Sequence, residues 1–198
     1  MYNWFDYIIE DGNMEIQLAS IKDAASIQKI YCYYVENTNI SFEYEAPTVS
    51  EMEKRIQNTL SLYPYLIAKD DNKVIGYAYA SAFHSRSAYQ WGVELSIYVD
   101  EYYHGKHVAS SLYEALFKIL QKMNIINVYA CIVHPNVKSE NFHHRLGFQD
   151  IGIYRKSGYK FNQWHDVIWM QKTIGDYDHV QPIRYMQELS NEEIELCL

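Results

Sequence analysis

The sequence predicts one α+β domain with a mixed, mostly antiparallel sheet and flanking helices. Strand-like and helix-like patterns alternate along its 198 residues, of which 48% are hydrophobic and 21% are charged. This balance is typical of a chain that buries a core, and it excludes wholesale disorder. Hairpins occur beside strand–helix–strand units without an internal repeat, which favours the α+β class. Only 8 Gly and 4 Pro are present, so collagen-like and Gly/Pro-rich low-complexity chains are also excluded.

The first part of the chain predicts a strand and two helices. The strand is expected at residues 14–18. Apolar residues then recur at the spacing of an amphipathic helix that ends near Asn37, namely Ile27, Ile30, Tyr31, Tyr34 and Val35. The segment Thr48-Val49-Ser50-Glu51 is a capping box that begins the second helix, and Pro64 ends it.

The middle of the chain predicts a hairpin, a strand and a long helix. Residues 65–69 and 73–83 are strand-like on either side of an Asp-Asp-Asn turn. The strand 91–99 leads through a loop into a helix at residues 108–123. Asn124 follows directly, at the position where a chain that leaves a helix commonly enters the left-handed region, which Asn tolerates.

The last part completes the predicted sheet. An apolar strand is expected at residues 127–133 and a short helix at 139–146. Two further strands, 148–155 and 164–172, close the sheet. Beyond them the strand-like and helix-like patterns are no longer clear. Residues 175–198 are interpreted as a C-terminal tail and candidate contact with a second copy.

Charge and cysteine content exclude several classes of partner. The formal net charge is −8, and neither a Lys/Arg run nor a basic amphipathic helix is present, which argues against nucleic acid and against an anionic membrane surface. The N-terminal stretch lacks the pattern of a signal peptide. The three cysteines have no CxxC pairing and are expected as free thiols in the cytoplasm: Cys32, Cys131 and Cys197.

One loop is a candidate anion site. Gly105 and Lys106 lie between a predicted strand and the start of a helix, where free N–H groups and the helix dipole bind phosphate. On spacing alone, an ordinary strand-to-helix turn explains the same pattern. The pair His104 and His107 is also half of a metal-site spacing, but with no third ligand nearby no metal is expected.

Several separate motifs carry a family resemblance. The runs VELSIYVDEYYHGKHVASSLYEAL, CIVHPNVKSENFHHRLGF and SGYKFNQWHDV resemble the GNAT N-acetyltransferase superfamily. Within it, IYCYYVENTNISFEYEAPT and YLIAKDDNKVIGYAYASAFHSRSAYQW resemble the phosphinothricin and methionine sulfoximine acetyltransferase branch. The resemblance implies the GNAT acyl-CoA N-acyltransferase fold over residues 14–174, with 1–13 as an N-terminal extension. It also implies acetyl-CoA as co-substrate, no metal, and a homodimer whose pockets are completed by the partner chain.

The resemblance assigns residues to acetyl-CoA. One strand end would pair with the pantetheine arm, the loop and helix start would hold the pyrophosphate, and two residues would line the far side. The strand end consists of Ile97, Tyr98 and Val99. The loop and helix start consist of His104, Gly105, Lys106, His107, Val108, Ala109 and Ser110. The two residues on the far side are Asn136 and Ser139. The family loop reads Q/R-x-x-G-x-G/A, so His104 replaces the Gln/Arg and His107 replaces the first glycine. That glycine allows a positive φ or a close backbone approach, and His visits the left-handed region more readily than most residues.

The resemblance also assigns catalytic roles. Glu94 corresponds to the general base, and His143 to a histidine that shares this role. The reaction needs such a base because a protonated amine cannot attack a thioester. The structural alternatives are a Glu94 paired with Arg86 or with a backbone donor, and a His143 that is a satisfied core or surface residue. Tyr98 and Ser139 are candidates for the general acid.

The acceptor pocket is assigned to Phe42, Tyr79, Arg86 and Tyr89, with Arg86 gripping a carboxylate or phosphinate through its two-pronged guanidinium. The expected activity is acetylation of the amine of a small amino-acid-like compound. Two alternatives stay open: acetylation of a protein N-terminus or a polyamine, and an acyl-CoA-binding relative with weak or no turnover because of His107. Residues 39–43 and the tail are the candidate contacts of a homodimer.

Overall fold

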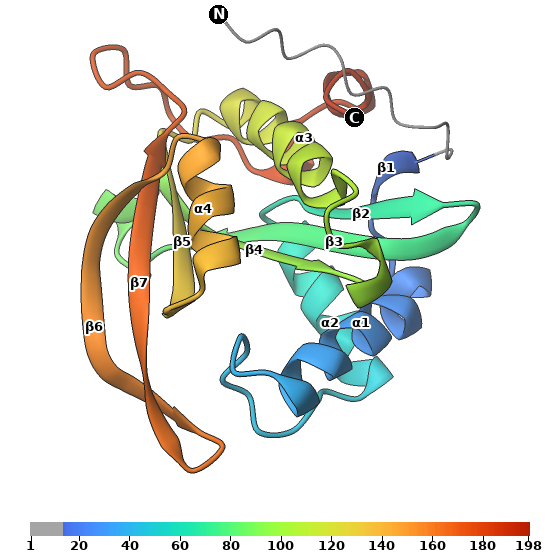
Figure 1. Ribbon diagram of the computed structural model, residues 1–198. Coiled ribbons are helices and arrows are strands. Elements are labelled where there is room, and N and C mark those ends of the chain that lie inside the picture. Colours follow the sequence, from blue (N-terminus) through green and yellow to red (C-terminus); the bar gives the residue numbers. More distant parts are fainter. Residues whose placement is uncertain (1–13) are drawn as a thin grey trace, which may run out of the picture.

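A seven-stranded mixed sheet forms the centre of the molecule (Figure 1). The computed structural model describes residues 14–198, so the expected N-terminal extension at 1–13 lies outside the described residues. The sheet has the order β1-β2-β3-β4-β5-β7-β6. Among the described strands every neighbouring pair is antiparallel except β4 and β5. The strands are β1 (Met14–Leu18), β2 (Tyr65–Asp70), β3 (Lys73–Ala82), β4 (Gly92–Val99), β5 (Asn127–His134), β6 (Gln149–Lys160) and β7 (Gln163–Thr173).

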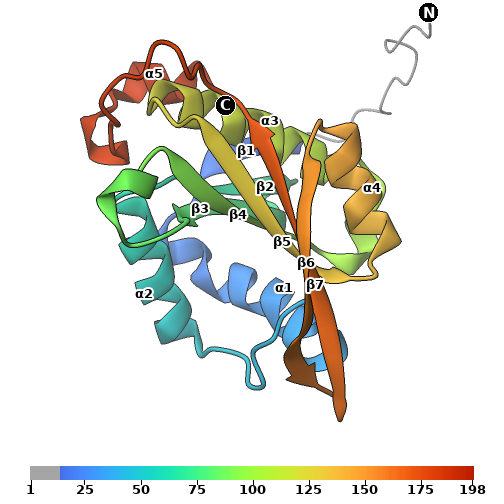
Figure 2. The ribbon, with the colours of Figure 1, turned by 90° about the vertical axis from the view of Figure 1, so that its left-hand side faces the viewer.

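Helices cover the sheet on both faces (Figures 1 and 2). One face carries α1 and α2, and the other carries α3 and α4, with the short α5 beside α3. Two separate apolar cores result, one beneath α1 and α2 and one beneath α3. The helices are α1 (Ala24–Asn37), α2 (Val49–Leu60), α3 (Val108–Lys122), α4 (Val137–Arg145) and α5 (Asn191–Glu195).

Local signals in the sequence account for the first helices. The five apolar positions expected on one face of α1 are all buried. At the start of α2 the capping box forms as expected, because Glu51 N–H donates to Thr48 Oγ1 at 3.2 Å and Thr48 N–H donates to Glu51 Oε2 at 2.7 Å. Asn124 ends α3 with a φ of 63°. The expected start, end and buried face of these helices are therefore confirmed.

Two elements differ from their expected bounds by more than one residue at an end. Helix α4 begins at Val137 instead of 139, because the Asn136 side chain accepts a hydrogen bond from Ser139 N–H and caps the helix. Strand β6 continues to Lys160, beyond the expected end at residue 155. The register of β6 on β7 shifts between Tyr154 and Gly158, and this irregularity hid the continuation from the alternating pattern.

The C-terminal segment packs on its own chain. Met186, Leu189, Ile194 and Cys197 are buried in the core that α3 covers. The main chain is anchored as well, since Arg184 N–H donates to the carbonyl of Met123 at 2.9 Å. The segment after Gly175 is thus a folded layer of the domain, and its contact with a second copy stays a prediction.

Leu189→Ala tests the contribution of this layer. Leu189 is 8% exposed, so its truncation leaves a cavity and is expected to lower the free energy of unfolding by about 2–3 kcal/mol in urea titration. The matched control is Leu196→Ala in the same segment, because Leu196 is 75% exposed. Its expected effect is within about 0.5 kcal/mol. Equal effects of the two variants would contradict the packed-layer interpretation.

Candidate active site

The two parallel strands separate in the middle of the sheet. β4 pairs with β5 from Gly92 opposite Asn127 to Glu94 opposite Tyr129, and no pair follows. On its other edge, β4 stays paired with β3 as far as Val99. Among the described strands, none pairs with residues 95–99 on the β5 side. An edge of this kind offers backbone donors and acceptors to an extended ligand.

A cavity of about 390 Å³ lies in this opening. Its walls come from α1 and the loop behind it, from both diverging strands, and from α3 and α4. The lining residues are Tyr31, Ile40, Ser41, Phe42, Glu43, Glu94, Leu95, Ser96, Ile97, Tyr98, Tyr113, Ala130, Cys131, Ile132, Val133, Asn136, Ser139 and His143.

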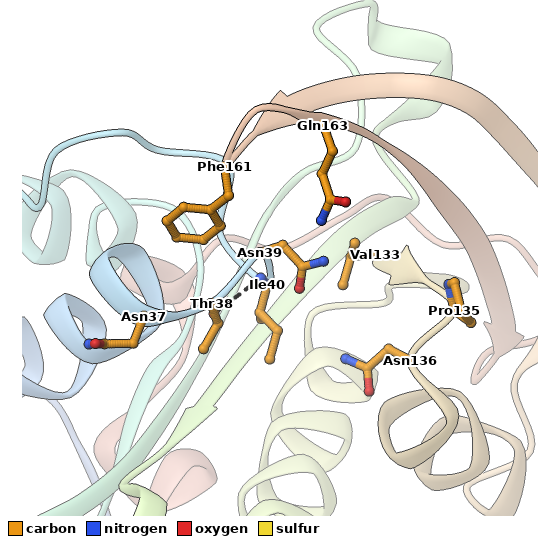
Figure 3. Close-up of a pocket in the computed structure, with 9 residues that line it drawn as sticks. All are labelled: Asn37, Thr38, Asn39, Ile40, Val133, Pro135, Asn136, Phe161 and Gln163. Carbon is orange, nitrogen blue, oxygen red and sulfur yellow. Dashed lines mark hydrogen bonds between the residues drawn. The ribbon is translucent and has the colours of Figure 1, made fainter.

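A second cavity of about 520 Å³ adjoins the first (Figure 3). Three segments form it: the end of α1 with its following loop, the junction of β5 with α4, and the turn between β6 and β7. Ile40, Val133 and Asn136 line both cavities, so the two spaces meet there. The remaining lining residues are Asn37, Thr38, Asn39, Pro135, Phe161 and Gln163.

Glu94 stands where the strands separate. Its neighbours Val93 and Leu95 point into the α3 core, so Glu94 projects to the opposite face. The side chain is half-buried, and this burial raises the pKa of Glu94 above its ordinary value. Among the described residues, Glu94 forms no ion pair with Arg86. A raised pKa and an open cavity are the properties that a general base for an amine requires.

His143 is buried beside the same cavity. Its Nδ1 lies 2.8 Å from the carbonyl oxygen of Ser139, which can only accept, so Nδ1 carries the proton. Nε2 then accepts from the Tyr113 hydroxyl at 3.2 Å. Burial lowers the pKa of His143 to about 4, which keeps the ring neutral at pH 7. Both nitrogens are thus satisfied within the protein, as in the core-histidine alternative, and proton transfer through Nε2 requires Tyr113 to release it.

The start of α3 has the geometry of an anion site. His107 is the N-cap of α3 in the left-handed region with φ 61°, and its side chain makes no capping hydrogen bond. Gly105 is also left-handed, with φ 79°. No acidic residue occupies the first turn of α3, unlike the first turns of α2, α4 and α5. The first N–H groups of α3 and the helix dipole therefore face outward without a competing carboxylate.

The other residues assigned to acetyl-CoA have varied surroundings. His104 turns back onto β4, with Nε2 2.8 Å from the Tyr34 hydroxyl oxygen and 3.1 Å from the Val99 carbonyl oxygen. Its imidazole anchors the loop instead of pointing outward. Lys106 Nζ lies 4.7 Å from the centroid of the Tyr103 ring. Ile97, Tyr98, Asn136 and Ser139 line the cavity at the divergence.

The four residues assigned to the acceptor separate into two groups. Phe42 lines the cavity with Glu94. Tyr79 stacks on Tyr65, with ring centroids 4.9 Å apart. Arg86 and Tyr89 lie exposed in the segment between β3 and β4, away from the lining of either cavity. Within one chain, Phe42 shares the cavity wall with Glu94. Tyr79 lies near Glu94 as well, because the Glu94 charge contributes, after burial, to the raised pKa of Tyr79.

An ion-pair network in the cavity wall was missed in the sequence. Arg55 donates to both oxygens of Glu43, at 2.7 and 3.0 Å, and the Tyr31 hydroxyl donates to Glu43 Oε1 at 2.9 Å. Burial opposes ionisation of Glu43, but the hydrogen bonds from Arg55 and Tyr31 outweigh it and lower the pKa of this carboxyl. The sequence shows the Ser-Phe-Glu run at 41–43, but only the folded structure places Arg55 of α2 against Glu43.

The comparisons with known proteins decide the family. A family model described as an acetyltransferase (GNAT) domain matches residues 16–169. This chain belongs to the GNAT acetyltransferase family. As a member of this family it is an acetyltransferase. The family resemblance and the fold that the sequence predicts are both confirmed.

Relatives place the chain within this family. It is 31% identical to the phosphinothricin N-acetyltransferase of Streptomyces viridochromogenes, over 89% of this chain and 96% of that one. It is 27% identical to an L-methionine sulfoximine/L-methionine sulfone acetyltransferase of Salmonella typhimurium, over 83% and 96% of the two chains. A solved phosphinothricin acetyltransferase from Sinorhizobium meliloti, in complex with AcCoA, superposes with a TM-score of 0.81 at 32% identity over 86% and 94% of the chains.

The described residues offer neither a cluster of metal ligands nor a helix that could span a membrane. Within residues 14–198, no cluster of three His, Cys, Asp or Glu side chains has an arrangement that could hold a metal ion. Over the same residues, no helix combines the length and the apolar character that crossing a membrane requires.

His143 predicts a pH dependence of stability. Its pKa falls from the usual value near 6.5 to about 4 on folding, so between these values the unfolded chain binds the extra proton. This contribution to stability is present above about pH 6.5 and is lost as the pH falls toward 4, with a slope of up to about 1.4 kcal/mol per pH unit. When the free energy of unfolding is measured by urea titration from pH 7 down to pH 4, its slope against pH should be shallower for His143→Gln than for the wild type. Identical slopes would contradict a neutral buried imidazole.

Proposed function

We propose that this protein transfers the acetyl group of acetyl-CoA to the amine of a small amino-acid-like acceptor, such as phosphinothricin or methionine sulfoximine. The observation that carries the proposal is Glu94, a half-buried carboxyl with a raised pKa at the point where β4 and β5 diverge and the cavity opens. The names of the relatives supply the acceptor class. Acylation of a protein N-terminus or of a polyamine uses the same chemistry, and the acceptor panel below distinguishes these cases.

The chain offers two features that suit acetyl-CoA. The free edge of β4 at residues 95–99 can pair with the amides of the pantetheine arm, as one strand pairs with another. The start of α3 presents N–H groups and the positive end of its dipole to the pyrophosphate. This backbone site explains how a chain of net charge −8 can hold a polyanion.

The reaction follows from these positions. Glu94 removes a proton from the acceptor's ammonium group, directly or through water, and frees the nitrogen lone pair. The nitrogen attacks the thioester carbon and loses its second proton, the C–S bond breaks, and the electron pair leaves on the CoA sulfur, which takes up a proton to give the free thiol. Backbone N–H groups on the open edge of β4 can stabilise the transient oxyanion. Burial raises the pKa of Tyr98 well above its usual range, which makes this side chain a weak acid for the leaving thiolate.

Assembly and location complete the proposal. The β6–β7 ribbon exposes a row of large apolar side chains, which supports a homodimer: Ile151, Ile153, Tyr154, Tyr159, Phe161 and Trp164. Arg86 and Tyr89, which do not line the cavities of their own chain, suit the acceptor site of a partner in such a dimer. The three cysteines are free in the described structure, which supports a reducing, cytoplasmic environment.

Glu94→Gln tests the general base. A thiol-release assay with amino acids, sulfoximines, phosphinothricin, polyamines and an N-terminal peptide identifies the acceptor. For that acceptor we expect kcat to fall about 10²–10⁴-fold, because the amide cannot take the proton. The Kd for acetyl-CoA, measured by calorimetry, should stay unchanged. Full activity of the variant would remove Glu94 from the mechanism, and a panel without turnover would favour the acyl-CoA-binding alternative.

His107→Gly tests the cost of a side chain in the pyrophosphate loop. His107 holds the left-handed conformation of the replaced glycine, at a cost of about 1–2 kcal/mol for an L-residue. His107 has this conformation without ligand, so relief of the strain stabilises the fold in the free and the bound protein alike. The loss of Cβ, which lets the pyrophosphate approach the backbone more closely, should tighten acetyl-CoA binding by about fivefold. His107→Ala is the control, because it removes the imidazole and keeps Cβ. Tighter binding by the alanine variant alone, or by neither, would contradict the backbone explanation.

A further inference from the structure

The tip of the β6–β7 ribbon lies against the loop that follows α1. Phe161 and Gln163, at the turn of the ribbon, lie near Asn39 and Ile40 in the close-up (Figure 3). The loop, residues 38–44, supplies Ile40, Ser41, Phe42 and Glu43 to the cavity that contains Glu94. The ribbon tip, residues 158–165, thus adjoins one wall of the acceptor cavity from the outside.

Lys160 fixes the main chain of the 38–44 loop. It is 3% exposed, and its Nζ donates to the carbonyls of Val35, Thr38 and Ser41 at 2.6, 2.9 and 2.7 Å. An ammonium group has three N–H donors, so all of them are used. Val35 belongs to the last turn of α1, which has no basic residue of its own. Lys160 therefore brings a positive charge from a distant strand to the negative end of this helix.

Gly158 leaves the space that the Phe42 ring occupies. A Cβ on Gly158 would clash with three atoms of that ring, Cδ2, Cε2 and Cζ. The φ of Gly158 is outside the left-handed region, so its backbone conformation is open to any residue. The constraint at Gly158 is therefore steric, and the three nearest atoms all belong to the Phe42 ring.

Two further hydrogen bonds complete the contact. The Tyr44 hydroxyl donates to the carbonyl of Tyr159 at 2.5 Å. The Asn39 amide nitrogen lies 3.1 Å from His165 Nδ1, while His165 Nε2 donates to the carbonyl of Lys160 at 3.1 Å. The loop is thus held at both ends and in its middle by one ribbon tip.

We propose that Lys160 and Gly158 are positioning residues for the acceptor: they hold the 38–44 loop so that Phe42 and Glu43 form a wall opposite Glu94. Neither residue touches the reacting atoms, since the Lys160 donors are all used within the protein and Gly158 has no side chain. The inference rests on the proposed acetyltransferase function. It adds that acceptor recognition depends on a ribbon more than 100 residues away in sequence from the loop, as the separation of 119 between Lys160 and Ser41 shows.

Gly158→Ala tests the steric part. The added methyl must displace the Phe42 ring, so we expect KM for the acceptor to rise about tenfold, with the Kd for acetyl-CoA unchanged. The matched control is Gly152→Ala on the same strand, where a Cβ meets nothing within 4 Å and φ is likewise outside the left-handed region. Its acceptor KM should stay within about twofold of the wild type. Equal values for the two variants would overturn the role of Gly158.

Lys160→Met tests the polar part, because it retains most of the length of the side chain and removes the donors. We expect faster amide hydrogen exchange in residues 38–44 and a higher acceptor KM at unchanged acetyl-CoA affinity. Lys172→Met is the control, since Lys172 Nζ donates to the carbonyl of Leu146 at the end of α4, away from this loop. It is expected to lower the melting temperature without faster exchange in the 38–44 loop.

The exchange measurement separates this inference from the proposed function. It needs no acceptor, so a wild-type protein that acetylates nothing in the panel would refute the proposed acceptor class and still leave the contact testable. Faster exchange in Lys160→Met without any change in acceptor KM would overturn the positioning role and leave a purely structural contact. Unchanged exchange in residues 38–44 would overturn the inference altogether. If Lys160→Met does not fold, the comparison of Gly158→Ala with Gly152→Ala decides it.

Discussion

The end of the parallel pairing between β4 and β5 is the constraint on which the site depends. After Glu94 and Tyr129 the two strands separate, while β3 stays paired with β4 as far as Val99. A closed sheet would have buried the backbone groups of residues 95–99 in hydrogen bonds and left no room for a cavity. The separation opens a polar edge and a space of about 390 Å³ in the middle of an otherwise continuous sheet, with Glu94 at its apex.

The two faces of the sheet contribute different groups to the site. The face under α3 is densely packed, and the start of this helix offers backbone N–H groups where β4 ends. The face under α1 contributes side chains, since Glu94, Ser96 and Tyr98 alternate with the apolar residues that point toward α3. One strand thereby presents backbone along its edge and a carboxyl on its face, the two features that the proposed reaction uses.

Ionisable groups around the cavity have distinct surroundings, and these surroundings set their chemistry. Burial without a partner raises the pKa of Glu94, whereas Arg55 and Tyr31 keep Glu43 ionised. Burial and two hydrogen bonds keep His143 neutral. Cys131 faces the same space with an exposed side chain, and desolvation by the cavity walls, assisted by the Glu94 charge, raises the pKa of its thiol above the ordinary value. Among these groups, Glu94 is the one whose properties match proton removal from an amine.

Local signals in the sequence determined most of the fold. Apolar spacing fixed the buried face of α1, the capping box fixed the start of α2, and Asn124 marked the end of α3, because each of these signals acts within a few residues. The family motifs also predicted functional roles for Glu94 and for the loop before α3. For His107, the replaced glycine left a positive φ and a close backbone approach as alternatives, and the structure shows the positive φ.

Other features were decided only by the tertiary structure. The burial of the C-terminal segment beside α3, the neutral state of His143, and the ion pair of Glu43 with Arg55 all depend on which elements meet in space. The contact of Lys160 with Val35, Thr38 and Ser41 is the clearest case. In sequence, Lys160 resembles any polar residue near a turn. Its role arises because the β6–β7 ribbon returns to the end of α1, where three backbone carbonyls without helical partners require a donor.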